Sequence, residues 1–435
     1  MALNGTMDDY LQFVYEGYLG ASSCGGTDVA RHPGLIRELA DLAGIEAPQR
    51  MLVVTGSKGK GSVSALAAAA LSGAGQRCGL VTSPHLIHLT ERIRVDGRAI
   101  GDTEFREIVE DLEPLIRRYA ATLPSGVYLG PSGLYLLFAL RYFQQMGIDT
   151  AVVEAGRGGL LDESTRFGHS VAAITTVRLE HPAELGPELE DIARHKAGAI
   201  PLRGHAFCAH QEPSALAILR DRAAAVGATL LVEGEGFLGE ARPSEVAIST
   251  PGAEGTRRMP FRPAGLYQAS NAALALAAAE QLLGQAIERP LWAELQLPGR
   301  LQQISASPDV IVDGAIVRAS AEAAVRFAKA RGRSPIVAVI GVPVDKDYRG
   351  VISVAGAAAG HIIVTRTATA RLSYPEDALA YAASFVSSSS APTLAEALRE
   401  AEALAGAAGL VLVLGTQSLV AEALRHYSVD PRHIY

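Results

Sequence analysis

The amino-acid sequence predicts an α/β protein of two domains, each built on a mostly parallel β-sheet. The chain has 435 residues, more than one hydrophobic core usually serves, and 49% of them are apolar. Short apolar runs that end in Gly, Ser or an acidic residue alternate with longer Ala- and Leu-rich segments, which is the pattern of parallel βαβ units. The expected strands are 51–54, 78–82, 150–153 and 171–177 in the first half and 310–312, 335–340, 361–364 and 410–414 in the second.

The two halves are expected to form separate sheets on either side of a hinge at residues 297–300. The sequence Leu-Pro-Gly-Arg interrupts regular structure at this point. We therefore expect an N-terminal P-loop mononucleotide-binding domain over 1–297 and a smaller C-terminal Rossmann-like α/β domain over 298–435. Shorter pieces broken by Gly and Pro over 229–263 predict an antiparallel or irregular insertion, and a helix is expected over 270–283.

The C-terminal half carries two local signals. Four consecutive serines, 387–390, predict a surface loop. Thr393 and Glu396 have the spacing of a capping box, so a helix is expected to begin directly after Thr393.

Composition and charge exclude several classes of function. The net charge of −7 argues against a nucleic-acid partner, because phosphate-backbone binding depends on clustered Lys and Arg. No apolar run approaches the roughly 20 residues that a membrane-spanning helix needs, and the N-terminus lacks the basic and apolar stretches of a signal peptide. We therefore expect a cytoplasmic protein without a membrane partner. Its three cysteines, Cys24, Cys78 and Cys208, are expected to be reduced and structural.

The first chemical signal is a glycine-rich turn between an expected strand and an expected helix at 63–71. Its residues are Gly56, Ser57, Lys58, Gly59, Lys60, Gly61 and Ser62. Glycines let backbone N–H groups wrap phosphate oxygens, the start of the helix adds partial positive charge, and Lys60 adds a full charge. Ser62 is a candidate magnesium ligand. An extra glycine separates Lys60 from Ser62, so the strict phosphate-loop pattern is not met and a plain turn of small residues is the alternative.

Polar residues follow three other expected strands. Ser83 and His85 follow the second strand, Glu154 ends the third, and Glu180 and His181 follow the fourth. Because the carboxyl ends of parallel strands meet at one edge of the sheet, these groups are expected to converge on one crevice. Hydroxyl, carboxylate and imidazole groups beside a phosphate site could complete the coordination of a hard cation. The alternative for each residue alone is a capped turn.

The third signal is a lysine on the buried face of an expected helix. The segment 187–197 begins with proline, carries acids early and places Leu189, Ile192 and Ala193 on one stripe, to which Lys196 also belongs. An isolated buried ammonium is costly, so Lys196 is expected to be paired, neutral or modified. A lysine that snorkels to solvent at the end of the helix is the alternative.

Together these motifs resemble those of folylpolyglutamate synthase and dihydrofolate synthase, which belong to the Mur ligase superfamily. The residues that carry the resemblance are 56–62, 82–86, 91–94, 154–162, His181, 196–198, 271–274, 298–301 and 313–315. They cover nearly the whole chain in the order of the family. Several spaced motifs in one order are far more specific than any single loop.

The resemblance implies how ATP is bound. Lys60 and its loop would bind the phosphates. Asn271, Arg300 and Asp313 would contact the nucleotide, the last two from the hinge and the C-terminal domain.

The resemblance also implies two magnesium ions. Ser83, Glu154 and His181 would hold magnesium together with the candidate Ser62. In the family, the lysine at the position of Lys196 is carbamylated by carbon dioxide, which gives a carboxylate that can bind a second ion. Lys60, His181 and Lys196 are the expected catalytic residues.

The implied reaction joins a small-molecule carboxylic acid to an amine or amino acid. The carboxylate attacks the γ-phosphate of ATP, and the amine then converts the acyl phosphate into an amide. Phosphoryl transfer depends mostly on positioning and on the electrostatics of magnesium and lysine. Closure of the domains about the hinge would exclude water from the acyl phosphate.

The chain departs from the family pattern at several places. Ser57 and Lys58 replace Thr and Asn, Pro131, Ser132 and Gly133 replace an aromatic-acid pair, Glu163, Ser164 and Thr165 replace Ala-Thr-Asn, Glu180 replaces an aspartate, and Ile316, Val317 and Arg318 stand after Ala315 where the family has His and Asn. Most of these changes lie around the acceptor and amino-acid regions. The sequence therefore predicts retained ATP chemistry with a changed substrate pair, as in specialised biosynthesis.

Three alternatives remain open at this point. The first alternative to a ligase with changed substrates is a genuine folate enzyme that adds glutamate. A nucleotide-binding paralogue without turnover is favoured by the lost His-Asn pair and opposed by Glu154, His181 and Lys196. A P-loop kinase or GTPase would show no amine requirement.

Overall fold

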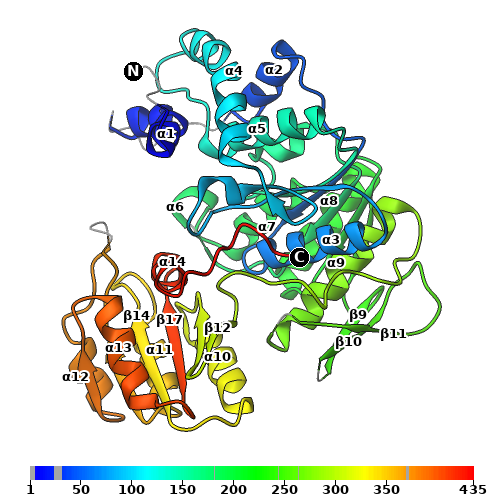
Figure 1. Ribbon diagram of the computed structural model, residues 1–435. Coiled ribbons are helices and arrows are strands. Elements are labelled where there is room, and N and C mark those ends of the chain that lie inside the picture. The colour runs from blue at the N-terminus through cyan, green and yellow to red at the C-terminus, as the bar shows by residue number, and fades with distance from the viewer. Residues whose placement is uncertain (1–4, 24–31, 181, 243, 263, 369–371) are drawn as a thin grey trace. The chain divides into compact units, whose positions relative to one another are not determined.

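The structure, a computed structural model, describes residues 5–23, 32–180, 182–242, 244–262, 264–368 and 372–435 (Figure 1). It divides into two compact α/β units. Unit 1 comprises Met1–Arg262, Tyr267–Leu295 and Tyr435, and unit 2 comprises Pro263–Leu266 and Gln296–Ile434. The chain thus changes units at Gln296, beside the segment expected to be a hinge, and again at three other points.

Unit 1 is built on an eight-stranded sheet in the order β4-β3-β2-β5-β1-β6-β7-β8. Its strands are β1 (Arg50–Thr55), β2 (Cys78–Val81), β3 (Ile93–Val95), β4 (Arg98–Ala99), β5 (Thr150–Glu154), β6 (Val171–Ile174), β7 (His205–Cys208) and β8 (Thr229–Val232). The strands from β2 to β8 in this order are parallel, and β3 and β4 add an antiparallel edge. The central strands are apolar because both of their faces are covered.

Helices cover both faces of this sheet. They are α1 (Met7–Ser23), α2 (Gly34–Leu42), α3 (Lys60–Gly73), α4 (Asp102–Ala120), α5 (Pro131–Gln145), α6 (Pro182–Leu185), α7 (Leu189–Ala197), α8 (Pro213–Val226) and α9 (Tyr267–Leu283), with 3₁₀ turns η1 (Leu89–Arg92) and η2 (Glu163–Arg166). The Ala-rich helices α3 and α9 pack against each other and the sheet. Helices α1, α2, α4 and α5 share a core with Val53, Val81 and Val153 of the strands. A three-stranded antiparallel sheet, β9 (Leu238–Arg242), β10 (Glu245–Ser249) and β11 (Arg257–Pro260), packs on α9.

Unit 2 is a six-stranded sheet in the order β12-β13-β17-β14-β15-β16. Its elements are β12 (Gln302–Ala306), β13 (Asp309–Asp313), α10 (Arg318–Ala330), β14 (Ile336–Gly341), α11 (Tyr348–Gly356), β15 (His361–Val364), α12 (Ala378–Ala383), β16 (Ser388–Ser390), α13 (Leu394–Ala405), β17 (Leu410–Gly415) and α14 (Gln417–His426). Only β12 is antiparallel among its described strands. Helices α10 to α12 share a core with one face of the sheet, and α13 and α14 pack on its central strands.

The predicted α/β class and the two separate sheets are confirmed. The expected insertion at 229–263 is only partly correct, because β8 is a parallel strand of the main sheet and only β9 to β11 form the antiparallel one. The surface loop expected at the serine run is wrong. Its backbone forms β16, an edge strand beside β15, and the hydroxyls of Ser387 and Ser389 lie 3.0 Å from the ring nitrogens of His361. Small polar side chains are tolerated at such an edge.

Helix boundaries also differ from the expectations. Pro187 does not begin α7, which starts at Leu189 after Glu188, whose N–H donates to Asp191 (3.3 Å). Helix α3 begins at Lys60 rather than at residue 63, so the lysine belongs to the first turn of the helix. The cap at Thr393 is confirmed, since its hydroxyl accepts the N–H of Glu396 (3.3 Å).

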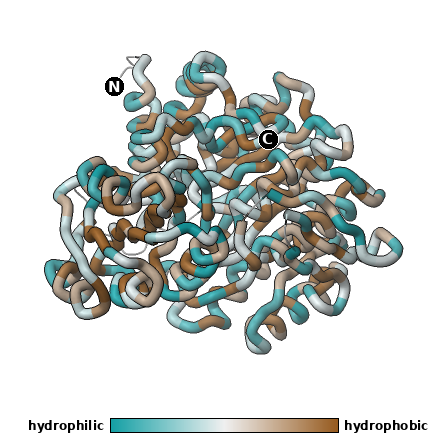
Figure 2. The backbone as a smooth tube through the Cα atoms, turned by 60° about the horizontal axis from the view of Figure 1, so that its bottom comes forward, coloured by the Kyte–Doolittle hydropathy of each residue, from teal (hydrophilic) through white to brown (hydrophobic). Residues whose placement is uncertain are grey.

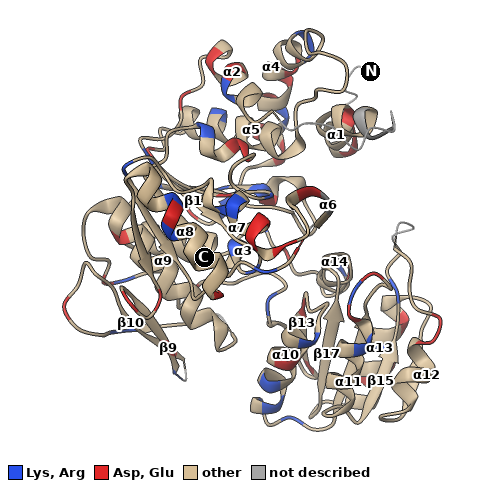
Figure 3. Cartoon of the chain, turned by 180° about the vertical axis from the view of Figure 1, so that it is seen from behind, with Lys and Arg blue, Asp and Glu red and all other residues tan. Residues whose placement is uncertain are grey.

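Segments of hydrophobic residues lie mainly in the interior of each unit (Figure 2). Acidic and basic residues are mixed with one another along the peripheral helices (Figure 3). Within the described part of the chain, none of the helices combines the length and the apolar composition needed to cross a membrane. Cys78 and Cys208 are buried and free, as expected, while Cys24 lies outside the described residues.

Candidate active site

The glycine-rich loop lies at the carboxyl end of β1 and is held against the neighbouring strand. Gly56 has φ +126°, and a Cβ there would stand 2.0 Å from Oγ1 of Thr175. Ser57 donates its hydroxyl to the carbonyl of Arg178 (3.1 Å) and accepts the N–H of Arg178 (3.0 Å). The side chain of Lys60 turns back over the loop, and its Nζ donates to the carbonyl of Gly56 (3.0 Å). The loop is thus fixed at the start of α3, where N–H groups and helix dipole favour an anion.

Asn271 of α9 lies against the same loop. A Cβ on Gly59, which has φ +93°, would stand 2.9 Å from Oδ1 of Asn271. The amide of Asn271 donates to Gln268 (2.8 Å), which orients it. Gly59 thus permits a close approach of loop and helix that no other residue would allow. The exposed Lys58 stands on this loop as well.

The end of β5 brings a carboxylate to the first turn of α3. Glu154 is buried, and its Oε2 accepts the N–H of Ser83, which follows β2 (2.9 Å). A Cβ on Gly61 would stand 3.4 Å from the same oxygen. Ser62, one residue further on α3, is buried too. The register of the parallel strands β2 and β5 therefore brings Ser83 and Glu154 together, next to the first turn of α3.

Lys196 of α7 is fully buried and forms an ion pair. Its Nζ donates to Oε1 of Glu180 (2.9 Å), whose side chain is 18% exposed. Burial lowers the pKa of Lys196, the nearby charge of Lys60 lowers it further, and Glu180 acts in the opposite direction. Burial acts to raise the pKa of Glu180, but the charge and hydrogen bond of Lys196, with a smaller effect of Lys60, hold it below its ordinary value. Of the states expected for Lys196, the structure contains the paired one.

In unit 2, Arg300 and Asp313 lie beside two glycines. A Cβ on Gly314 would stand 2.5 Å from Nη1 of Arg300, and that nitrogen donates to the carbonyl of Gly299 (3.3 Å). The carboxylate of Asp313 accepts the N–H of Leu301 (2.9 Å). Burial raises the pKa of Asp313 to about 6, although the charge of Arg300 and this hydrogen bond act to lower it.

The predicted residue His181 lies outside the described residues. Within the described ranges there is no group of three or more His, Cys, Asp and Glu side chains that could hold a metal ion. The hydroxyl and carboxylate oxygens of Ser62, Ser83 and Glu154 are nevertheless of the kind that magnesium prefers. His85, which follows β2, is not part of this group, because its Nδ1 accepts the Nε–H of Arg92 (2.9 Å).

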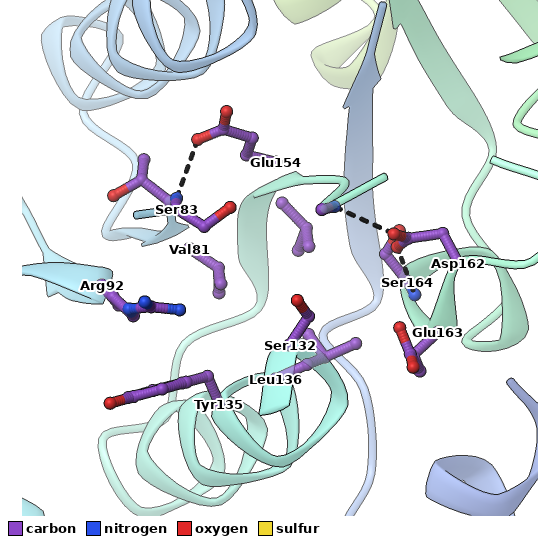
Figure 4. A pocket seen from close by; sticks show the side chains of 13 residues that line it. Val81, Ser83, Arg92, Ser132, Tyr135, Leu136, Glu154, Asp162, Glu163 and Ser164 are labelled. Atoms are coloured by element: carbon purple, nitrogen blue, oxygen red, sulfur yellow. Dashed lines mark hydrogen bonds between the residues drawn. The ribbon is translucent and has the colours of Figure 1, made fainter. Parts of the chain in front are cut away.

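A small cavity adjoins Ser83 and Glu154 (Figure 4). Its lining includes Arg92, Ser132, Tyr135, Asp162, Glu163 and Ser164. Arg92 and Asp162 belong to the recognised motifs at 91–94 and 154–162, but sequence reasoning assigned no role to either. Glu91 of the first motif serves the fold, since its carboxylate accepts the N–H groups of Leu86, Ile87 and His88. Arg92 faces the cavity instead.

These features define the class of protein. A glycine-rich loop joins a strand to a helix at the carboxyl edge of a parallel sheet, with a lysine, hydroxyls and carboxylates around it, as in nucleotide-binding α/β proteins. Residues 299–417 match the family model of the Mur ligase, glutamate ligase domain.

The chain belongs to the dihydrofolate synthase/folylpolyglutamate synthase family. The dihydrofolate synthase/folylpolyglutamate synthase of Escherichia coli is 32% identical over 308 residues, which are 70% of this chain and 69% of that protein. A solved structure of E. coli FolC in complex with DHPP and ADP is 27% identical, has a TM-score of 0.82 and covers 98% of both chains.

A probable bifunctional folylpolyglutamate synthase/dihydropteroate synthase of Halobacterium salinarum is 31% identical over 382 residues, which are 85% of this chain. The matched segment is 46% of that protein. The chain therefore spans less than half of the length of this relative.

Proposed function

We propose that this chain is an ATP-dependent ligase that joins glutamate to a folate-type acid through an acyl phosphate. The observation that carries the proposal is the convergence of the loop at Lys60, the Ser83–Glu154 contact and the Lys196–Glu180 pair at one edge of the sheet. Membership of the family supports a folate-type acid, because the E. coli relative is named as both a dihydrofolate synthase and a folylpolyglutamate synthase.

The loop fits the phosphates of ATP. Gly56 and Gly59 adopt positive φ within the loop, and α3 begins directly after it with N–H groups that can bind a phosphate. Lys60 would exchange its bond to the carbonyl of Gly56 for a phosphate oxygen. By the family resemblance, Asn271, Arg300 and Asp313 are also proposed to contact the nucleotide.

The oxygen ligands fit magnesium. Ser62, Ser83 and Glu154 would hold one ion, together with His181, and a carbamate on Lys196 would supply a carboxylate for a second. The lowered pKa of Lys196 supports the carbamate, because the neutral amine is the form that reacts with carbon dioxide. Magnesium bound there would neutralise part of the negative charge on the phosphates of ATP.

The reaction has two steps. A carboxylate oxygen of the acid bonds to the γ-phosphorus of ATP while the bond to the ADP oxygen breaks. The amine of glutamate then attacks the acyl carbon, phosphate leaves with one former carboxylate oxygen, and the amine loses a proton. Lys60 and the start of α3 stabilise the charge on the transferring phosphoryl group, and the buried walls around Glu154 limit access of water.

A changed acid is the second candidate. Ser132, Glu163 and Ser164, three of the positions that depart from the family pattern, line the cavity beside Ser83 and Glu154. This placement favours an acid that differs from the common folate substrates in the part that enters the cavity.

Mass spectrometry of the products tests the proposal. The full chain is incubated with ATP, magnesium and bicarbonate, with dihydropteroate or tetrahydrofolate as the acid and glutamate as the amine. We expect a product one glutamyl residue heavier and ADP release that requires acid and amine. Product only from other acids in a panel would support the second candidate. ADP release that ignores the amine would contradict a ligase.

A further inference from the structure

A series of hydrogen bonds runs along the outer edge of the unit 2 sheet, at β16. The imidazole of His361, the first residue of β15, lies between two hydroxyls: its Nδ1 is 3.0 Å from Oγ of Ser387, and its Nε2 is 3.0 Å from Oγ of Ser389. The hydroxyl of Ser389 donates in turn to Oε1 of Glu400 on α13, an oxygen that lies 3.8 Å from Nε2 of His361. Four polar side chains thus form one continuous relay from Ser387 to Glu400.

The direction of each bond in this relay follows from the hydrogens available. A carboxylate only accepts, so Ser389 uses its single hydroxyl hydrogen on Glu400. The oxygen of Ser389 must then accept a hydrogen from Nε2 of His361. In a neutral imidazole the other nitrogen carries no hydrogen, so Nδ1 is an acceptor and the hydroxyl of Ser387 donates to it. Glu400 therefore selects, through Ser389, the tautomer in which His361 is a base toward Ser387.

Ser387 is the solvent-facing end of the relay. It is exposed, whereas the His361 side chain is only 17% exposed. Ser384 is exposed as well, but its hydroxyl donates to the carbonyl of Tyr381 (2.7 Å), which cannot take up a proton. Ser387 therefore combines access from solvent with a hydrogen bond to a base, and this pairing is what activates a serine hydroxyl as a nucleophile.

The relay is separate from the candidate ligase residues of unit 2. Strands β17, β14 and β15 lie between β16 and β13 in the sheet. His361 begins β15 and Ser387 directly precedes β16, so both lie at the amino end of these parallel strands. Asp313 is the last residue of β13, at the carboxyl end of its strand. A role for the relay is therefore independent of ATP binding and of the ligase reaction.

We propose that Ser387 is a nucleophile that accepts acyl groups from activated carboxylic acid derivatives, such as esters and thioesters. Its Oγ bonds to the acyl carbon while the bond from that carbon to the leaving oxygen or sulfur breaks. Nδ1 of His361 takes the hydroxyl proton and passes it to the leaving group. The nearby carboxylate of Glu400 stabilises the imidazolium formed in this step. His361 is the catalytic base, and Ser389 is a positioning residue that holds its ring and tautomer.

Residue-resolved acetylation of the full chain tests the proposal. The protein is incubated with 4-nitrophenyl acetate, and the acetyl groups on Ser387 and Ser384 are quantified over time by tandem mass spectrometry. We expect Ser387 to be acetylated about 100-fold faster than Ser384, because a positioned general base contributes a factor of this order. Ser384 is a matched control within the same molecule, since it is exposed and lies three positions away but has no base.

Variants of the relay separate its members. His361→Gln should lower the acetylation rate of Ser387 about 100-fold and leave that of Ser384 unchanged. Ser389→Ala should lower the rate of Ser387 about tenfold, because the ring loses the acceptor that sets its tautomer, and Ser389→Thr should restore it by returning the hydroxyl. Equal rates at Ser387 and Ser384 in the wild type would overturn the proposal, and this comparison requires no variant to fold. An unchanged rate at Ser387 in a folded His361→Gln would overturn it as well.

Discussion

The substitution Glu180→Gln should destabilise unit 1 because it removes the negative charge that pairs with a fully buried ammonium. Lys196 is 0% exposed and its Nζ lies 2.9 Å from Oε1 of Glu180. At this separation and an effective dielectric constant of about 20, the Coulomb attraction is about 6 kcal/mol. Loss of the proton from Lys196 limits the cost, because the amine can become neutral. Breaking a buried pair from one side typically costs about 3–5 kcal/mol, and we expect about 3 kcal/mol at pH 7.

Urea denaturation followed by fluorescence measures this effect. Trp292 is the single tryptophan of the chain, it is buried in unit 1, and its indole N–H donates to the carbonyl of Leu66 (2.9 Å). Its emission therefore reports the unfolding of this unit. Arg194→Gln is the control, because it breaks a pair with Asp191 on the same helix whose side chains are 62% and 33% exposed. An exposed pair of this kind should cost less than about 0.5 kcal/mol.

The pH dependence gives the reasoning a second test. The pair exists only while Glu180 is ionised and Lys196 is protonated. Its contribution should be lost as pH falls through the lowered pKa of Glu180 and again as pH rises through the lowered pKa of Lys196. The difference between wild type and Glu180→Gln should therefore shrink at both ends. A loss no larger than that of Arg194→Gln, or one that is constant from pH 3 to pH 10, would refute the account of the pair.

Three further predictions concern the loop and unit 2. Gly56→Ala should lower the free energy of unfolding in urea by about 3 kcal/mol or more and abolish ADP binding by calorimetry, because its Cβ would meet Thr175. Gly75→Ala is the control, since Gly75 also has positive φ but open space around it. It should lower the free energy of unfolding by about 1 kcal/mol and bind ADP normally. Lys60→Ala should lower ATP turnover about 100-fold or more in a coupled ADP assay, and Lys58→Ala much less; equal effects would contradict the role of Lys60. Burial raises the pKa of Asp313 to about 6, so the folded state loses stability from this group as pH rises from about 4 to about 6. Asp313→Asn should therefore stabilise unit 2 by about 1–3 kcal/mol at pH 8 and hardly at pH 4. Hydrogen exchange of β13 would measure the difference.

Local patterns in the sequence located most of the candidate residues of unit 1. Glycines next to Lys60 predicted the loop, the end of an apolar run predicted Glu154, and helical periodicity predicted the burial of Lys196. Each of these is a property of a few neighbouring residues. The parallel sheet then brings the strand ends together because of its topology, which is why the predicted Ser83 and Glu154 are in contact.

Long-range partners could not be predicted in the same way. Glu180 pairs with Lys196 across 16 positions of the chain. The side chain of Glu163 packs against Gly130 and Gly133, which lie about 30 positions earlier in the chain. Nothing local distinguishes Arg92 from the neighbouring Arg94, yet only Arg92 lines the cavity. Strand β8 was misjudged because its partner β7 has too short an apolar run to stand out. In each case the deciding information is a contact between distant segments.

The most direct test of the central claim follows an oxygen atom. The acid substrate is labelled with ¹⁸O in its carboxylate, and the phosphate released during ligation is analysed by mass spectrometry. If an acyl phosphate forms, each phosphate carries one oxygen from the carboxylate, so we predict singly labelled phosphate in proportion to amide product. Unlabelled phosphate accompanying labelled amide would contradict the acyl-phosphate mechanism.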